Sequence, residues 1–512
     1  MELRYLEFLK HIVRRRRRVY LDHNATTPVS RRVRRRMNQV LKHDHGNPSA
    51  LYESGRRSAA LMEEARRRVA EAIHAGPGEV YFTGCATESN NAVLKSLADH
   101  FYPQRKKIVS TPIEHPSVLR ALDYLRGRGI VVEYCPVDRQ GRVRLDALAK
   151  LVDGDTFLVC CMLANNEIGT IQDIGAVAGI ARRHGALVLA DCVQALGKIP
   201  VDVSGWGIDY ASFSAHKLYG PKGAGALYVR QGSPFAPWMH GGHQEDGMRA
   251  GTESLHNIAG FGAACAEVGK LLARAGRSRA LKGRLLRELK AVKPDLAVNS
   301  PDEGCLPNTL SVTLPGVDQA ELMAVLDQHG VAVSAGSACS SRDDRPSPTL
   351  KAIGLSDQAA RQTLRISLGR NTSPRDIRYA ARVFRDHLRG RSRFVDMMAP
   401  DRLDQALLFD EQVYILDVRP QFLRRRFAGL PNSHEAPFGA LGKVLPQLPR
   451  DRRILVVCQN GNLSYITAYY LKSRGFASVS NLKGGVNAWK ERHADLYHKH
   501  AGKNITPLRA GK

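Results

Sequence analysis

The sequence predicts an α/β protein in which a mainly parallel sheet is followed by a smaller α+β unit and then by a second α/β domain. Between residue 19 and about residue 262, short apolar runs alternate with amphipathic helical segments, and the same alternation starts again near Pro400. Alternation of this kind is typical of parallel sheets covered by helices. The length of 512 residues agrees with about three domains of ordinary size.

Buried strands are expected at the short apolar runs. In the first domain these runs are residues 80–82, 107–110, 156–160, 186–191 and 225–229. Apolar residues recur with helical spacing at 174–184, and residues 263–292 read as one long helix. In the second α/β domain we expect strands at 413–416 and 454–457 and a helix from about Tyr465.

The changes of pattern along the chain predict six segments. Strands mix with helices from about residue 306, and the charge rises while the pattern fades near residue 390. The predicted segments are a basic N-terminal extension (1–18), a large domain (19–262), a small domain (263–390), a linker (391–400), a second α/β domain (401–497) and a basic tail (498–512).

The net charge of +27 is unusual, and arginines at 14–18 and 31–36 and basic residues at 503–512 carry part of it. The positive electrostatic field of these residues could attract nucleic acid or an acidic partner protein. The favoured interpretation is nevertheless a set of solvated helix faces, because charge patterning alone rarely identifies a partner. A role of the basic N-terminus in docking tRNA stays open as an alternative.

The chain is expected to be cytoplasmic and to have no membrane segment. No apolar run approaches the ~20 residues that a membrane span needs, and the N-terminus lacks the apolar core of a secretory signal. The nine cysteines are scattered and form no CxxC pair. An odd, scattered set of cysteines in a long chain favours a reducing compartment, and no metal site is predicted.

The most informative residue is Lys217, which lies between Ser214, His216 and a glycine-rich segment. Asp191 ends the apolar run at 186–191, so it is expected at the C-terminal end of a buried strand. An aspartate that holds a pyridinium proton and a lysine that forms a Schiff base are the residues that pyridoxal phosphate requires. The pair therefore predicts this cofactor.

Other polar motifs also follow predicted strands, at residues 83–91, 114–117, 165–169 and 191–194. A helix N-terminus such as the one in 83–91 can bind a phosphate, although a plain helix cap fits that motif alone equally well. In open α/β sheets, ligands bind at the carboxyl ends of the strands. The four motifs together therefore predict one site at this edge of the sheet.

These residues resemble the class V aminotransferase-like superfamily and, within it, the cysteine desulfurases. The resemblance covers about residues 19–389 and rests on the motifs at 20–28, 86–90, 114–115, 165–169, 214–217, 247–252, 337–341 and 365–370. It implies the type I fold of pyridoxal phosphate-dependent transferases, with a mainly parallel seven-stranded sheet and a small α+β domain.

The resemblance also implies a role for each residue around the cofactor ring. Lys217 would form the Schiff base and then act as the base at the substrate Cα. Asp191 would keep the ring nitrogen protonated, His115 would stack on the ring and assist proton transfer, and Gln194 would contact the phenolic oxygen.

The two ends of the site follow from the same resemblance. The phosphate would be held by Ala86, Thr87, Ser214 and His216. Thr252 would reach the phosphate of a neighbouring subunit, which implies a homodimer. Arg365 would clamp the substrate carboxylate through its planar guanidinium, and Asn166 would assist it.

Cys339 decides the expected reaction. A single cysteine is by itself more often an inert core residue, but in the family this position is the sulfur acceptor. Its thiolate would attack the sulfur of the cysteine–cofactor adduct, leaving alanine and a persulfide on Cys339. The polar stretch from Cys339 to Leu350 resembles the long-loop subgroup, whose cysteine can move outward to pass sulfur on.

The C-terminal domain has its own cysteine, Cys458, in a tight loop before a predicted helix. Together with the motifs at 416–419 and 482–489, it resembles a rhodanese domain over about residues 400–495. Related phosphatases need an arginine where Ser464 stands, which argues against phosphate-ester hydrolysis. Leu463 stands where rhodanese loops commonly have arginine, which argues against thiosulfate as the sulfur donor more than against persulfide transfer.

The sequence therefore predicts a pyridoxal phosphate-dependent cysteine desulfurase that converts L-cysteine to L-alanine and passes sulfur from Cys339 to Cys458. The expected final acceptors are iron–sulfur scaffolds or tRNA-thiolation enzymes. Two alternatives stay open. One is a selenocysteine lyase or cysteine lyase, and the other is a sulfur-carrier protein in which only the rhodanese domain is active.

Overall fold

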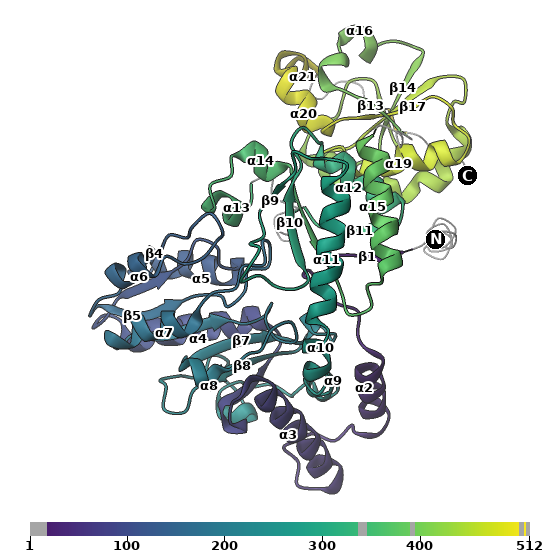
Figure 1. Ribbon diagram of the computed structural model, residues 1–512. Helices are drawn as coiled ribbons and strands as arrows, with labels where there is room; N and C mark the ends of the chain where they lie inside the picture. Colours follow the sequence, from purple (N-terminus) through teal and green to yellow (C-terminus); the bar gives the residue numbers. More distant parts are fainter. Residues whose placement is uncertain (1–17, 336–345, 390–394, 501–505, 508–512) are drawn as a thin grey trace. The chain divides into compact units, whose positions relative to one another are not determined.

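The computed structural model describes residues 18–335, 346–389, 395–500 and 506–507. The chain divides into two compact units. The first unit contains Tyr20–Val317 and Val333–Arg378, and the second contains Arg18 and Val19, Asp318–Ala332 and the described residues from Tyr379 onward. Figure 1 shows the elements of both units.

A seven-stranded sheet forms the centre of the first unit, as predicted. Its order is β2 (Val80–Thr83), β8 (Gly225–Val229), β7 (Tyr210–Ser214), β6 (Leu187–Asp191), β5 (Thr156–Cys160), β3 (Lys107–Ser110) and β4 (Val131–Tyr134). Strand β8 runs opposite to the other six strands of this sheet, so its pairings with β2 and β7 are antiparallel and the other pairings are parallel. The inner strands are buried along their whole length, which explains why their sequences are continuous apolar runs.

Alternate residues of these strands enter two separate cores. Val159 belongs to one hydrophobic cluster and Leu158 to the other, because successive side chains of a strand point to opposite faces. The helices that flank the sheet are α4 (Ala86–Phe101), α5 (Pro116–Arg126), α6 (Leu145–Leu151), α7 (Ile174–Arg183) and α8 (Val203–Trp206) (Figure 1). The carboxyl ends of β3, β5 and β6 thus share one edge.

The arginine run at 31–36 lies on helix α2 (Arg31–His43), which precedes α3 (Glu53–Ile73). Ser30 caps α2 by accepting a hydrogen bond from the backbone N–H of Val33. Val33 and Val40 are the residues of α2 that are buried, and Arg31 is exposed. The run is thus one polar face of an amphipathic helix.

The prediction of one long helix at 263–292 is wrong in detail. This region contains the end of α9 (Leu255–Cys265), then α10 (Val268–Leu272) and α11 (Ala275–Lys290). At the two breaks the backbone N–H groups of Glu267 and Arg274 bond to carbonyls three residues earlier. Such tighter turns interrupt an α-helix without reversing the chain.

The first unit also contains a three-stranded antiparallel sheet, with the order β12 (Thr363–Ser367), β10 (Thr309–Thr313) and β9 (Ala297–Val298). The short helices α13 (Pro348–Ala352) and α14 (Asp357–Arg361) precede β12. Ser311 pairs with Arg365 in this sheet. Arg365 is therefore fixed by backbone pairing at the middle of β12, an edge strand of this sheet.

The second unit is built on a six-stranded parallel sheet. Its order is β13 (Asp396–Met398), β17 (Val479–Leu482), β16 (Arg453–Val457), β14 (Val413–Asp417), β15 (Ser433–Glu435) and β18 (Thr506–Pro507). Trp489 is fully buried in its core and donates to the carbonyl of Leu403 at 2.7 Å. Part of the predicted linker (391–400) is in fact strand β13, and part of the predicted tail (498–512) is strand β18.

The remaining elements of the second unit are helical or short. They are α16 (Gln405–Leu408), α17 (Gln421–Arg426), α18 (Leu441–Val444), α19 (Asn462–Ser473), α20 (Gly485–Arg492), α21 (Ala494–His500), α12 (Gln319–Gln328) and β11 (Val331–Ala332). Helix α15 (Pro374–Leu388) starts in the first unit and continues into the second, and strand β1 (Val19–Tyr20), which pairs with β11, has Val19 in the second unit and Tyr20 in the first. Within the second unit, Lys483 Nζ lies 3.1 Å from Asp318 Oδ2.

No helix among the described residues is long and apolar enough to cross a membrane.

Candidate active site

A cavity of about 270 Å³ lies at the carboxyl ends of the parallel strands of the first unit. It brings together most of the cofactor and substrate residues that the sequence predicts. These are Ala86, Thr87, His115, Asn166, Asp191, Gln194, Ser214, His216, Lys217 and Arg365. The expectation that the polar motifs meet at one edge of the sheet is therefore met.

Lys217 ends the short turn that follows strand β7. Its Nζ donates hydrogen bonds to the backbone carbonyls of Asn24 and Ala25 at 2.7 and 2.8 Å. Both carbonyls belong to the N-terminal motif at 20–28. This motif therefore orients the amine inside the cavity.

Asp191 is the last residue of β6 and is only 5% exposed. Its Oδ1 accepts a hydrogen bond from the backbone N–H of Val193 at 3.0 Å, and its Oδ2 accepts one from Asn90 Nδ2 at 3.2 Å. These bonds fix the carboxylate, which fits a protonated pyridine nitrogen. Asn90 was not among the predicted site residues.

His115 caps helix α5, and its Nδ1 accepts from the backbone N–H of Ser117 at 3.1 Å. Burial lowers the pKa of His115, and the nearby Lys217 lowers it further, while Asp191 opposes the shift. The ring is therefore expected to be neutral at pH 7, which suits stacking on an aromatic cofactor.

The preceding Glu114 is buried and was not predicted as a site residue. Its Oε1 accepts hydrogen bonds from Thr111 Oγ1 at 2.7 Å and from the backbone N–H of Met162 at 2.8 Å. Burial raises the pKa of Glu114 to about 7, and the charge of Asp191 adds to this effect. Glu114 thereby joins the segment after β3 to the segment after β5.

The predicted phosphate end of the cavity lies at the N-terminus of α4. The N-cap residue Cys85 makes no side-chain cap bond, so the first amides of the helix keep donors for an anion. Thr87, Ser214 and His216 add side-chain donors around them. Burial, followed by the charge of Lys217, lowers the pKa of His216 to about 4. This set of amide, hydroxyl and imidazole groups fits a phosphate.

Thr252 does not line the cavity of its own chain. It is exposed and follows Gly251, whose φ of 102° is in the left-handed region. A residue in this position is available to a second chain, and its contact with the phosphate of a neighbouring subunit stays a prediction.

The predicted substrate end of the cavity contains Arg365, which is 2% exposed. Its Nη1 donates to the carbonyl of Asn166 at 3.2 Å, and its Nη2 pairs with Asp22 Oδ1 at 2.9 Å. Its Nε is buried and has no hydrogen-bond partner among the described residues. Because a buried donor is costly to leave unpaired, this guanidinium is suited to a carboxylate ligand.

We expect the Arg365→Lys variant to raise the KM for L-cysteine by roughly 10- to 150-fold, the equivalent of the ~1.5–3 kcal/mol that a hydrogen bond to a charged group contributes. A lysine cannot form the two parallel bonds of a guanidinium. Steady-state alanine release measures the change. The exposed Arg361 provides the matched control as Arg361→Lys, and an unchanged KM in Arg365→Lys would contradict the assignment.

Cys339 lies outside the described residues, but both flanks of its segment are described. On the N-terminal side, the backbone of Ser334 exchanges hydrogen bonds of 3.1 and 2.8 Å with the backbone of Arg365. On the C-terminal side, Ser347 Oγ donates to the buried Glu167 Oε2 at 2.6 Å. Both flanks are therefore tied to the substrate end of the cavity.

Cys458 lies in the second unit, in the loop between β16 and α19. It is 2% exposed, and Ser464 Oγ donates to its Sγ at 3.2 Å. The loop is compact because Gly485 packs against it: a Cβ there would lie 2.3 Å from the Cys458 carbonyl oxygen. The helix after the loop begins at Asn462, earlier than the predicted Tyr465.

A buried ion pair supports this loop. Arg419 and Asp417 are almost fully buried and lie 2.7 Å apart, between Arg419 Nη2 and Asp417 Oδ2. Arg419 Nη1 also donates to Gln459 Oε1 at 3.1 Å. The pair at the end of β14 thus reaches the residue next to Cys458.

His23 and His216 are expected to lower the stability of the cofactor-free first unit as the pH drops from about 6.5 toward 4, whereas the raised pKa of Glu114 acts in the opposite direction. Burial lowers the pKa of His23 to about 4, and the charge of Lys198 is the next largest cause. Burial likewise lowers the pKa of His216 to about 4. In this window the unfolded chain binds protons that the folded chain does not, so each histidine contributes a slope of about 1.4 kcal/mol per pH unit. Urea unfolding followed by tryptophan fluorescence in a Trp489→Phe background measures the slope. Relative to the wild type, His23→Asn should reduce the slope by about 1.4 kcal/mol per pH unit, and an unchanged slope would contradict the assignment.

Comparisons with known proteins agree with this geometry. The aminotransferase class-V family matches residues 19–379, and the rhodanese-like domain family matches residues 399–492. Cysteine desulfurase IscS of Dictyoglomus turgidum is 40% identical over 372 residues, which are 72% of this chain and 94% of that protein. Cysteine desulfurase NifS of Azotobacter vinelandii is 37% identical over 362 residues, which are 70% of this chain and 90% of that protein.

Solved structures give the same result. A NifS-like protein superposes with a TM-score of 0.69 at 39% identity and covers 73% of this chain and 100% of its own. The structure of SspA in complex with cysteine superposes with a TM-score of 0.62 at 32% identity and covers 68% of this chain and 98% of its own.

Proposed function

Because the chain belongs to the class-V aminotransferase family and is a pyridoxal phosphate-dependent cysteine desulfurase with a rhodanese-like domain, we propose that it passes the sulfur of L-cysteine from Cys339 to Cys458. The single observation that carries the catalytic half is the convergence of Lys217, Asp191 and Arg365 on one cavity. These side chains are those that an amino acid bound to this cofactor requires.

When bound, pyridoxal phosphate supplies an electron sink for the charge that develops at the substrate Cα. The side chains of the cavity bind the substrate and hold or move its protons. Arg365 holds the substrate carboxylate, Asp191 keeps a proton on the ring nitrogen, and Lys217 removes the proton from Cα. The neutral ring of His115 covers the cofactor and assists proton transfer.

The sulfur step requires a thiol acceptor. The Cys339 thiolate attacks the substrate sulfur, so that an S–S bond forms as the substrate C–S bond breaks. The substrate Cβ takes up a proton, and alanine leaves. The balanced result is that one thiol and one cysteine become one persulfide and one alanine, without an external oxidant or reductant.

The second transfer moves the outer sulfur to the rhodanese-like domain. The Cys458 thiolate attacks the outer sulfur of the Cys339 persulfide, which restores the Cys339 thiol and leaves a persulfide on Cys458. The site at Cys458 supports this role, because the hydroxyl of Ser464 donates to the sulfur and the N-terminus of α19 follows it. Leu463 adds no charge there, which fits a persulfide donor better than thiosulfate.

We further propose a homodimer in which Thr252 completes the phosphate site of the other subunit, and a protein as the final acceptor. The names of the IscS and NifS relatives favour iron–sulfur cluster assembly as the pathway, with tRNA thiolation as the other expected use. The protein is proposed to act in the cytoplasm.

Mass spectrometry of the cysteine persulfides after addition of ³⁵S- or ³⁴S-labelled L-cysteine tests the relay. The wild type is expected to carry label on Cys339 and Cys458. Cys458→Ser should keep alanine release and the label on Cys339, whereas Cys339→Ser should lose the label at both positions. Label on Cys458 in the Cys339→Ser protein would contradict the relay.

The same variants separate the alternatives. A selenocysteine lyase or cysteine lyase predicts turnover of L-cysteine that survives Cys339→Ala. A sulfur carrier with an inactive catalytic half predicts no alanine from the wild type, but a persulfide on Cys458 when a separate donor is added.

A further inference from the structure

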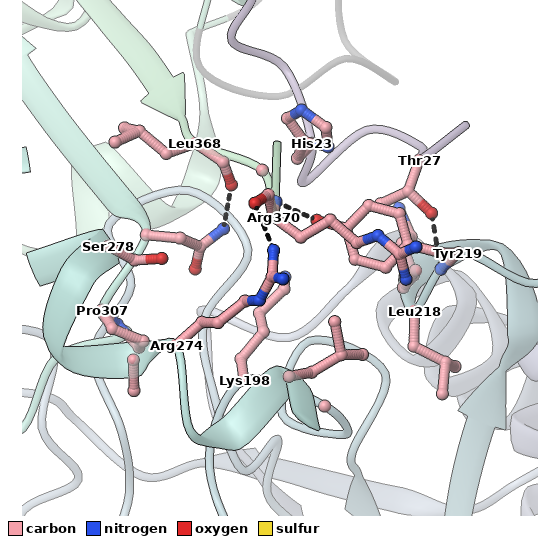
Figure 2. A pocket seen from close by; sticks show the side chains of 16 residues that line it. His23, Thr27, Lys198, Leu218, Tyr219, Arg274, Ser278, Pro307, Leu368 and Arg370 are labelled. Carbon is pink, nitrogen blue, oxygen red and sulfur yellow. Dashed lines mark hydrogen bonds between the residues drawn. The ribbon is translucent and has the colours of Figure 1, made fainter. Parts of the chain in front are cut away.

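A second lysine, Lys198, lies beside the catalytic cavity and is not used by the mechanism above. It lines a small cavity that adjoins Lys217 and also contains Arg274 and Arg370, and Figure 2 shows Lys198 and Arg274 among the side chains around it. Arg370 is already paired with Glu267 at 2.9 Å, and Arg274 donates to the Arg370 carbonyl. Lys198 instead points its nitrogen toward the residues of the catalytic cavity.

The hydrogen bonds of Lys198 involve two residues of that cavity. Its Nζ donates to Asn24 Oδ1 at 3.1 Å and also to Gln194 Oε1. Gln194 is 4% exposed, and its Nε2 donates to the backbone carbonyl of Asn24 at 2.9 Å. The Gln194 amide is therefore held from both ends.

The chemistry of the two groups fixes the orientation of the amide. The Lys198 nitrogen donates to the Gln194 oxygen, whereas a glutamine amide has an acceptor end and a donor end. Lys198 and the Asn24 carbonyl together favour the orientation in which the Gln194 oxygen faces Lys198 and the Gln194 NH₂ group faces Asn24, a residue of the cofactor cavity. The opposite orientation would lose the bond from Lys198 and would set the amide oxygen against the carbonyl oxygen of Asn24.

We propose that Lys198 is a positioning residue that keeps the NH₂ group of Gln194 available as a donor to the phenolic oxygen of the cofactor. This inference rests on the proposed function, in which Gln194 contacts that oxygen. With the amide reversed, the cavity would present a carbonyl oxygen to an oxygen that carries negative charge, which is unfavourable.

The surroundings of Lys198 are cationic. Burial lowers its pKa well below the usual value, and the charges of Lys217 and Arg365 lower it further. The charge of Lys198 also lowers the pKa of His23 and the pKa of His216. A direct effect of the Lys198 charge on Lys217 is therefore the alternative that an experiment must separate from the effect through Gln194.

The test is a pH titration of the visible absorbance of the cofactor-loaded protein for the wild type, Lys198→Met, Gln194→Ala and the double variant. Loss of the donor bond to the phenolic oxygen should raise the midpoint by about 0.4–1 pH unit, the equivalent of one ordinary hydrogen bond. We expect this rise in each single variant and no further rise in the double variant, because two residues that act through one contact are not additive.

A midpoint unchanged in Lys198→Met, or a Lys198→Met shift that is fully retained in the Gln194→Ala background, would overturn the inference. The exposed Lys150 provides the control as Lys150→Met, which should titrate as the wild type. If Lys198→Met fails to hold the cofactor, Gln194→Glu keeps an acceptor for Lys198 but has no donor, and an unshifted midpoint in it also overturns the inference. Wild-type protein that lacks the absorbance or releases no alanine contradicts the proposed function instead.

Discussion

The Lys217→Ala variant is expected to lose turnover of L-cysteine by at least about 10²–10⁴-fold, the share that a positioned acid–base group usually contributes. The loss is expected to exceed this range because the same amine also attaches the cofactor. In the structure the Lys217 Nζ is held by two backbone carbonyls and faces the cavity with Asp191 and Arg365. No other lysine lines that cavity among the described residues.

Alanine release and the visible absorbance of the purified protein measure this prediction. Both should be lost in Lys217→Ala and kept in Lys150→Ala, because Lys150 is exposed at the end of α6. Alanine release at more than about a tenth of the wild-type rate in Lys217→Ala would show that another group acts as the base.

The Arg419→Met variant is expected to destabilise the second unit by about 3–5 kcal/mol, because removing one partner of a buried ion pair leaves the other charge buried and unpaired. Asp417 is 0% exposed, and its two oxygens accept three side-chain hydrogen bonds from Arg419 at 2.7–3.0 Å. After the substitution this carboxylate loses the cation with which it is paired, and the loop of Cys458 also loses the bond from Arg419 to Gln459.

Denaturant unfolding followed by the fluorescence of Trp489, in a Trp206→Phe/Trp238→Phe background, reports on the second unit alone. Arg453→Met is the matched control. The Arg453 and Asp396 side chains also form an ion pair, at 3.0 Å, but they are 37% and 62% exposed, respectively. Such an exposed pair is worth about 0–1 kcal/mol. Equal midpoints for the Arg419 and Arg453 variants would contradict the prediction.

The sheet of the first unit could be predicted from sequence because its inner strands are buried on both faces. A strand such as β5 is then an uninterrupted apolar run, which contrasts with the amphipathic helices beside it. The breaks on either side of α10 could not be predicted, since Glu267 and Arg274 have ordinary helical preferences and the breaks consist of tightened hydrogen bonds. Strands β13 and β18 are short and lie near charged segments, so their pairing depends on neighbours far away in the sequence.

The residues of the candidate site also fall into those that could be predicted from the sequence and those that could not. Residues at strand ends, such as Asp191 and Lys217, were predictable because the fold class itself places them together. Asn90 was missed because its partner Asp191 lies far away in the sequence, and Glu114 because one of its partners is the distant backbone of Met162. The only local signal for Glu114 was its position next to His115, and the only one for Lys198 was its position four residues after Gln194.

The backbone pairing of Ser334 with Arg365 has an evolutionary consequence. A change that shifts strand β12 moves Arg365, the proposed binder of the substrate carboxylate, and at the same time Ser334, which precedes the segment of the proposed acceptor Cys339. Selection that moves Arg365 to suit a different substrate therefore also changes the start of the segment that contains Cys339. Variants of this enzyme should gain new substrate preferences mainly at positions outside that strand, where the two traits are free to diverge.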